Sequence, residues 1–185
     1  MCGRFFIKSD DKELMAIAQA AEAGLSLKVK TGEIFPTDIV AVQTGPGEYR
    51  PMKWGFSGFD KRPIINARSE TAMEKPTFKR SMLQSRCLVP ASGYFEWKKE
   101  GSKKIKYQFF RPQSLTLMAG LWRQETGLST PSFVILTRAA SPSLERVHDR
   151  MPVILPTNLM EDWLQKSPDA LAHAVLEMSF QETGQ

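Results

Sequence analysis

Cysteine and histidine are scarce in this sequence, which contains two of each among 185 residues. Two cysteines, Cys2 and Cys87, are too few for a disulfide framework, and this scarcity favours a reducing, cytosolic setting. The cysteines and histidines also lack the spacing of a structural zinc site. We therefore expect a cytoplasmic protein that uses neither a metal ion nor another cofactor.

Long apolar segments and internal repeats are missing as well. No apolar run approaches the ~20 residues that a transmembrane helix requires, so we expect no membrane partner. An acidic cluster at Asp10 and Asp11 stands where a secretory signal would need its apolar segment. Without a repeat, a low-complexity tract or a long linker, the length predicts one domain over residues 1–185.

Positive charge is concentrated in the middle of the chain. The net charge is +5, with nine Lys or Arg against three Asp or Glu between Arg50 and Arg86. From Pro156 onward the balance is reversed, with one lysine against five acidic residues. A basic middle with an acidic tail predicts an anionic partner, nucleic acid first. The lysine-rich segment 98–104 is instead interpreted as a solvated hairpin tip.

Periodicity and turn signals predict both helices and strands. A helix is expected over residues 10–24, capped by Ser9 or Asp10, then strands over 38–44 and 48–56, a loop over 60–71 and a short helix over 77–84. β-rich runs follow over residues 86–99, 105–111, 115–123 and 131–140, then a helical turn (141–147), a strand (151–155) and two helices (156–165 and 167–178). This order predicts an α+β fold of mostly antiparallel, twisted sheets in a barrel-like arrangement with peripheral helices.

The first chemical feature is the cysteine directly behind the initiator methionine. If Met1 is removed, Cys2 carries both a free α-amine and a thiol, and these groups titrate near pH ~8 and ~8.5 when unperturbed. The alternative is that Cys2 is simply a small buried residue, as cysteine often is. The first five residues alone favour that alternative.

Three polar residues in β-rich or apolar surroundings are candidates for catalysis. Glu96 lies between Phe95 and Trp97, where burial would raise its pKa and suit proton transfer; strand alternation would equally let it face water. His148, beside an aspartate, is a general acid or base or else a surface histidine. Asn66 follows two isoleucines, so its amide would need partners in the interior.

Several other residues are candidates for nucleic-acid contacts. Arg4, Arg68 and Arg150 could hold phosphates, or each could be an ordinary salt-bridge partner. Trp54 could stack on a base, although a tryptophan at a strand end is more often part of the core.

Taken together, the motifs resemble one known family. MCGRF at the start, Trp-Gly at 54–55, INARSET at 65–71, GYFEW at 93–97, LTRAA at 136–140 and HDRMPVIL at 148–155 occur in order. This order is similar to that of the SOS-response-associated peptidase (SRAP) family of abasic-site processing proteins, and the resemblance covers nearly the whole chain.

The resemblance implies a covalent reaction with DNA. The partner would be single-stranded DNA containing an abasic site, bound by a monomer that associates with the nucleoid when engaged. After Met1 removal, the Cys2 amine would form an imine with the sugar aldehyde and the thiol would close a thiazolidine crosslink. AP lyase activity, self-cleavage of the Met1–Cys2 bond and a role in the SOS response are implied as well.

The resemblance also implies roles for individual residues. Asn66 would orient the reacting groups, Glu96 would move protons and His148 would assist opening of the sugar ring. The implied DNA contacts are Arg4, Pro36, Trp54, Arg68, Lys75, Thr137 and Arg150. One departure stands beside Pro36, because Glu33 carries a carboxylate where relatives often have an asparagine.

Two alternatives belong to other classes. A mature N-terminal Cys-Gly also begins glutamine amidotransferases of the N-terminal-nucleophile type, in which the α-amine is the base for its own thiol. The third candidate is a non-catalytic single-stranded DNA-binding protein, in which the basic and aromatic residues matter and Cys2 does not.

Overall fold

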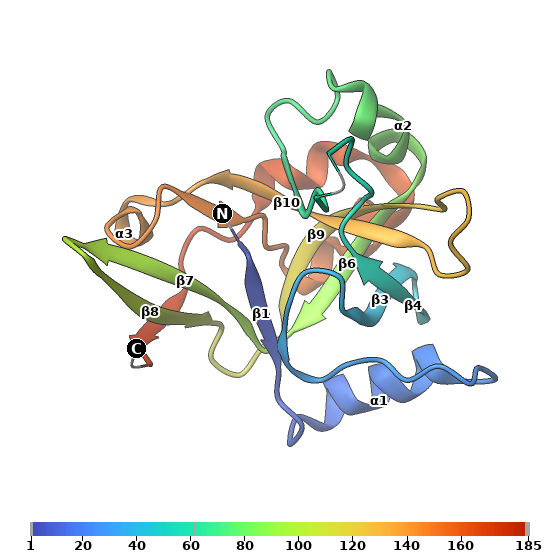
Figure 1. Cartoon of the computed structure of the whole chain (residues 1–185), viewed down its shortest axis with the longest axis horizontal. Coiled ribbons are helices and arrows are strands. Elements are labelled where there is room, and N and C mark those ends of the chain that lie inside the picture. Colours follow the sequence, from blue (N-terminus) through green and yellow to red (C-terminus); the bar gives the residue numbers. More distant parts are fainter. Residues whose placement is uncertain (1, 61, 184–185) are drawn as a thin grey trace.

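The computed structural model describes residues 2–60 and 62–183, which form two β-sheets with helices on the outside (Figure 1). The first sheet has the strand order β12-β8-β7-β1-β2. Its strands are β1 (Arg4–Ile7), β2 (Gly32–Ile34), β7 (Gly93–Glu100), β8 (Lys103–Phe110) and β12 (Ser179–Glu182). All the pairings along this sheet are antiparallel.

The second sheet has the order β11-β10-β4-β3-β6-β9, and β9 also pairs with β10. Its strands are β3 (Ile39–Gly45), β4 (Glu48–Trp54), β6 (Arg86–Ala91), β9 (Thr116–Arg123), β10 (Ser132–Ala139) and β11 (Arg150–Pro152), with β5 (Asn66–Arg68) on the side of β10. Strands β4 and β10 share only two residue pairs. The second sheet therefore closes into a ring of strands rather than a true barrel. The predicted α+β class with mostly antiparallel sheets is confirmed.

Three aromatic side chains, those of Phe5, Trp54 and Phe133, pack together in the hydrophobic core. Trp54 is completely buried; its ring centroid lies 5.0 Å from that of Phe5 and 6.4 Å from that of Phe133, and its Nε1 donates to the carbonyl oxygen of Ile65. Burying an aromatic side chain of this kind stabilises a fold by roughly 1.5–3 kcal/mol. This burial contradicts the predicted stacking of Trp54 on a base, since no base can reach the ring.

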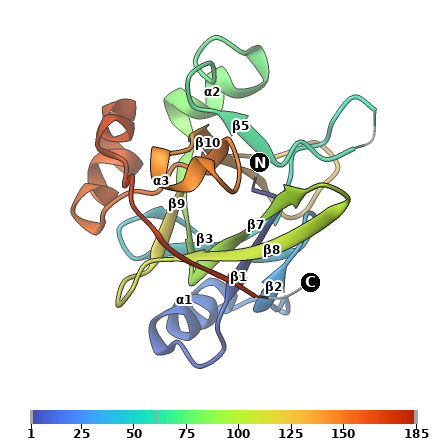
Figure 2. The ribbon, with the colours of Figure 1, turned by 90° about the vertical axis from the view of Figure 1, so that its left-hand side faces the viewer.

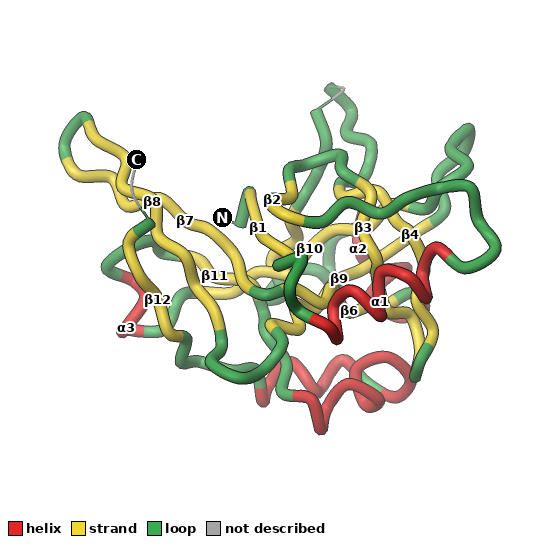
Figure 3. The backbone as a smooth tube through the Cα atoms, turned by 90° about the horizontal axis from the view of Figure 1, so that it is seen from below, coloured by secondary structure: helices red, strands yellow, loops and turns green. Residues whose placement is uncertain are grey.

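The helices cover the outside of the sheets, as the view from below shows (Figure 3). Helix α1 (Lys12–Glu22) buries Leu14, Ile17 and Ala21, and α2 (Pro76–Gln84) and α3 (Pro142–Glu145) are shorter. The cap of α1 is Asp11, whose Oδ1 accepts from the backbone N–H of Glu13 and of Leu14. The cap therefore lies one residue beyond the predicted Asp10.

The two helices predicted near the end of the chain are replaced by shorter turns. These are 3₁₀ helices at Thr157–Leu159 and Pro168–His173 and a π helix at Asp162–Lys166. Ser167 has an extended backbone, with φ −143° and ψ 147°, which suits the residue before a proline. The following residues lead into β12, which the sequence did not predict and which pairs with β8.

The β-rich run 86–99 is two strands in two different sheets. The chain leaves β6 at Ala91 and enters β7 at Gly93, where a Cβ would lie only 2.1 Å from the carbonyl oxygen of Phe109. Ser92 between them donates its N–H to the carbonyl oxygen of Phe6 on β1. This crossing places β7 beside β1 (Figure 2), with Arg4 opposite Phe95.

Candidate functional site

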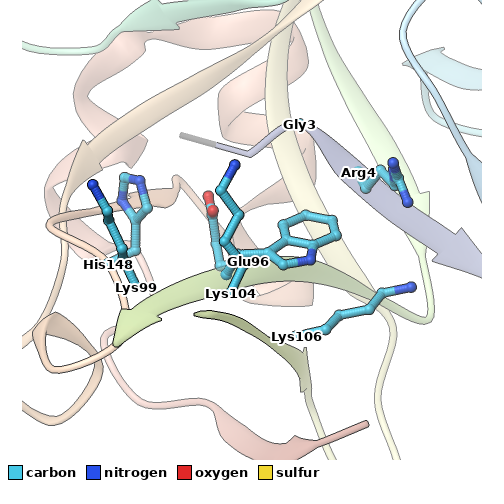
Figure 4. A pocket seen from close by; sticks show the side chains of 8 residues that line it. Gly3, Arg4, Glu96, Lys99, Lys104, Lys106 and His148 are labelled. Atoms are coloured by element: carbon cyan, nitrogen blue, oxygen red, sulfur yellow. The ribbon is translucent and has the colours of Figure 1, made fainter. Parts of the chain in front are cut away.

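A pocket of about 610 Å³ lies where β1, β7 and β8 approach the end of α3. It is lined by Gly3, Arg4, Glu96, Trp97, Lys99, Lys104, Lys106 and His148 (Figure 4). Because β1 runs antiparallel to β7 with Arg4 opposite Phe95, the residues before Arg4 lie beside Glu96. Three predicted residues, Arg4, Glu96 and His148, are thus brought together at a position adjoining Cys2.

Cys2 precedes Gly3 of the pocket lining and is completely buried. Its Sγ lies 3.7 Å from the carbonyl oxygen of Arg4, to which it donates a hydrogen bond. Burial raises the pKa of the Cys2 thiol, and the Glu96 carboxylate raises it further. The thiol is therefore held in its neutral form. The state of Met1 lies outside the described residues.

Asn66 fixes the backbone of Cys2 from the opposite sheet. Its Nδ2 donates to the Cys2 carbonyl oxygen at 2.8 Å, while its Oδ1 is buried and accepts no hydrogen bond from the described residues. Asn66 is the first residue of β5, which runs parallel to β10 with Asn66 opposite Ile135. The loop predicted over residues 60–71 therefore contains a strand, and this strand brings the amide to Cys2.

Glu96 is 4% exposed, so the alternative in which it faces water is wrong. Burial raises the pKa of its carboxyl group, and the nearby His148 opposes this shift. The Nδ1 of His148 accepts a hydrogen bond from the backbone N–H of Arg150 at 3.0 Å, so a neutral ring carries its proton on Nε2. The exposed Asp149 carboxylate lies 2.8 Å from the same Nδ1, a contact that becomes favourable when the ring is protonated.

Arg4 is held between two aromatic rings and a carboxylate. Its guanidinium carbon lies 4.2 Å from the ring centroid of Phe35 and 5.1 Å from that of Trp97. Its Nη1 donates to Glu33 Oε1 at 3.0 Å, and Lys106 Nζ donates to the same oxygen at 2.9 Å. Partial burial raises the pKa of Glu33, but the bonds from Lys106 and Arg4 outweigh this effect and lower it. Glu33 therefore stays ionised between two cations.

Arg150 is oriented in the same way by Glu70. Its Nη1 and Nη2 donate to the two carboxylate oxygens of Glu70 at 2.7 and 2.9 Å, and these bonds lower the pKa of Glu70 to about 2. Nη2 also donates to the Thr137 carbonyl oxygen at 2.8 Å. Thr137 is completely buried, which contradicts its predicted contact with DNA; it positions Arg150 instead.

The remaining predicted DNA contacts do not line the pocket. Arg68 is exposed on β5, two residues beyond Asn66, and Lys75 is the exposed N-cap residue of α2. Pro36 is half-buried in the turn that Asp38 N–H closes onto the Phe35 carbonyl oxygen. The DNA-binding roles of these three residues stay predictions.

The structure adds residues that the sequence reasoning did not place. Trp97, Lys99, Lys104 and Lys106 line the pocket, although segment 98–104 was interpreted as a solvated tip. The sequence signal that could have found them is the hairpin register, because a turn at Gly101 aligns Trp97 with Lys106. Within residues 2–60 and 62–183, no group of His, Cys, Asp and Glu could hold a metal ion, and no helix is long and apolar enough to cross a membrane.

Comparison with known proteins gives consistent matches. The family model for SOS response associated peptidase (SRAP) matches residues 1–183. The chain is 36% identical over 178 residues to the abasic site processing protein YedK of Escherichia coli (strain K12), covering 90% of this chain and 80% of that protein. It is 36% identical over 199 residues to the abasic site processing protein YobE of Bacillus subtilis (strain 168), covering 95% of this chain and 89% of that protein.

A solved structure matches over the same length. The crystal structure of a protein from Bacteroides thetaiotaomicron superposes with a TM-score of 0.81 at 25% sequence identity, covering 98% of this chain and 91% of that one. Sequence and fold therefore agree over almost the entire chain. On these grounds, the chain belongs to the SOS response associated peptidase (SRAP) family.

Proposed function

We propose that this protein processes abasic sites in single-stranded DNA by forming a covalent crosslink through Cys2 after removal of Met1. The observation that carries the proposal is the position of Cys2, whose carbonyl is held by Asn66 next to a basic pocket that contains Glu96 and His148. The names of the relatives YedK and YobE, both abasic site processing proteins, support the same substrate.

The reaction begins with the α-amine of Cys2. In the ring-opened abasic sugar the amine adds to the C1′ aldehyde, and loss of one water leaves an imine. The thiol then adds to the imine carbon and its proton passes to the nitrogen, which closes a thiazolidine ring. Since the thiol acts within the same residue, this second step is intramolecular and strongly favoured. The proton that the nitrogen gains comes from the sulfur, so ring closure consumes no external acid.

The proton transfers fall to the two titratable groups of the pocket. A carboxyl group whose pKa is raised by burial, as for Glu96, can donate a proton to the departing hydroxyl and recover it later. His148 assists ring opening, with the proton on Nε2 directed to the ring oxygen. The buried Asn66 Oδ1 can accept a hydrogen bond from the nitrogen of the intermediate, which the described residues leave it free to do.

The cations around the pocket hold the flanking phosphates. Arg4, Lys106 and Arg150 are already fixed by carboxylates, so little side-chain freedom is lost when a phosphate replaces or joins these partners. AP lyase activity, self-cleavage of the Met1–Cys2 bond, a role in the SOS response and action as a cytoplasmic monomer belong to the same proposal. The imine is the intermediate that would lead to strand cleavage if the thiol did not close the ring.

The decisive experiment is the intact mass of the protein before and after incubation with a single-stranded oligonucleotide that carries one abasic site. The protein alone reports whether Met1 has been removed. We expect a species with the mass of protein plus DNA minus one water, and no such species for Cys2→Ala. A fully processed parent that gives no adduct would refute the proposal. Ammonia release from glutamine would then favour the amidotransferase, and salt-sensitive binding that ignores the lesion would favour a non-catalytic DNA-binding protein.

A further inference from the structure

The β7–β8 hairpin extends from the body of the molecule (Figures 1 and 3) and carries lysines on both of its faces. In its register, Trp97 lies opposite Lys106 and Lys99 lies opposite Lys104. Side chains alternate between the two faces of a strand, so these four share one face. All four line the pocket. The hairpin is therefore one wall of the candidate site.

Lys99 and Lys104 are an unusual pair on this face. Like charges directly opposite one another on paired strands are destabilising, and both side chains are exposed. Two other lysines of the hairpin have acidic partners, since Lys98 pairs with Glu100 and Lys106 pairs with Glu33, and Lys103 lies opposite Glu100 in the register. Among the ion pairs of the described residues, none involves Lys99 or Lys104. An anion placed between the two ammonium groups would relieve their repulsion.

The cations of the pocket lie on both sides of Glu96. In Figure 4, Lys99 lies on the same side of Glu96 as His148, Lys104 lies beside Glu96, and Arg4 and Lys106 lie on the other side. Cations thus stand at both ends of the pocket, with the proton-transferring carboxyl group between them. A polyanionic strand that crosses the pocket would meet Lys99 and then Lys104 on one side of the pocket, and Arg4 and Lys106 on the other.

We propose that Lys99 and Lys104 form a second phosphate-binding site, which holds a backbone phosphate of the bound strand on the His148 side of the reacting sugar. This inference rests on the proposed function for the identity of the strand. Arg4 and Lys106 hold the phosphate on the opposite side. The hairpin thereby extends the DNA footprint beyond the nucleotide that reacts and fixes the direction of the strand through the pocket.

The test compares two double variants of the same hairpin. Lys99→Gln/Lys104→Gln removes the pair that faces the pocket, and Lys98→Gln/Lys103→Gln removes the same charge from the other face. The probe is a single-stranded oligonucleotide with one tetrahydrofuran abasic analogue, which has no aldehyde and reports binding without a crosslink. Affinity is measured over a series of salt concentrations, with probes extended only on the 5′ side or only on the 3′ side.

Loss of this one phosphate contact should reduce the slope of log K against log salt by about 0.7, which is about fivefold in affinity near 0.1 M salt. We expect this loss only for the pocket-facing variant and only for probes extended on one side of the lesion. Equal losses for the two variants, or equal losses on both sides of the lesion, would overturn the proposal. So would a parent protein that does not bind the probe.

Crosslinking separates this inference from the proposed function. At saturating concentrations of an oligonucleotide with a true abasic site, the pocket-facing variant should reach the same final crosslink yield as the parent. A parent that fails to crosslink, together with a slope difference between the two variants, would refute the covalent reaction and leave the phosphate site standing. Normal crosslinking without a slope difference would refute the phosphate site and leave the covalent reaction standing.

Discussion

Replacing Asn66 tests the geometry of the site most directly. Its Nδ2 donates the 2.8 Å hydrogen bond to the Cys2 carbonyl oxygen, and Asn66→Ala would leave that acceptor without this donor. A buried polar group that loses its partner costs about 1–3 kcal/mol. If this cost falls on the transition state for imine formation, the single-turnover crosslinking rate falls by about 5- to 150-fold, at about 1.4 kcal/mol for each factor of ten.

Asn66→Asp sharpens the test, because a carboxylate has nearly the same shape but cannot donate a hydrogen bond to the carbonyl. We expect it to crosslink at least as slowly as Asn66→Ala. The matched control is Asn158→Ala, an exposed asparagine in the 3₁₀ helix Thr157–Leu159, which should crosslink at the parental rate. Thermal unfolding of each variant separates loss of fold from loss of reactivity. Parental rates for both Asn66 variants in folded protein would refute the reasoning.

The remaining predictions concern the three carboxylates of the site. Glu33→Gln removes a negative charge that competes with phosphate for Arg4. Two unit charges ~4 Å apart in a water-like environment interact by about 1 kcal/mol, so titration with single-stranded DNA should show about fivefold tighter binding. Weaker binding would show that Glu33 mainly positions Arg4. Glu70→Gln should lower stability at neutral pH by no more than about 1 kcal/mol, since the Glu70 side chain is 47% exposed. Because the pKa of Glu70 is lowered in the folded state to about 2, the parent's advantage in urea unfolding should be present above the usual pKa of ~4.3 and disappear as the pH falls towards 2; an advantage that persists there would contradict the Arg150 pairing. Burial raises the pKa of Glu96, so crosslinking that depends on its proton should slow as the pH rises through that raised pKa. Glu96→Gln should crosslink more slowly than the parent and lose this pH dependence. A variant with the same pH profile as the parent would assign the proton to another group.

The sequence was most informative where short motifs contain unusual residues. The ordered motifs identified the SRAP family, and the family model confirms this over residues 1–183. Alternating apolar residues and turn signals predicted most of the strands that the structure contains. Such patterns are visible in the sequence because they reflect local preferences of the backbone and side chains.

Burial separated residues that the sequence treated alike. Trp54 and Trp97 both lie in strands next to a lysine, yet Trp54 is in the core and Trp97 lines the pocket. Arg150 and Thr137 were both expected on the DNA path, but Thr137 is buried and positions the arginine. Which face of a strand is covered depends on the sheet that packs against it, and this cannot be read from one strand alone.

By itself, the sequence determined the family, the fold class and the candidacy of Cys2, Asn66, Glu96 and His148, because these follow from residue types and their order. Only the tertiary structure decided how they meet. Asn66 reaches Cys2 because a three-residue strand pairs with β10. Glu96 reaches the pocket because the chain leaves the second sheet after β6 and enters the first sheet as β7, beside β1. The register of the β7–β8 hairpin places Lys99 and Lys104 of the lysine-rich segment along the pocket. Such long-range pairings depend on the packing of the whole chain, which local sequence preferences do not specify.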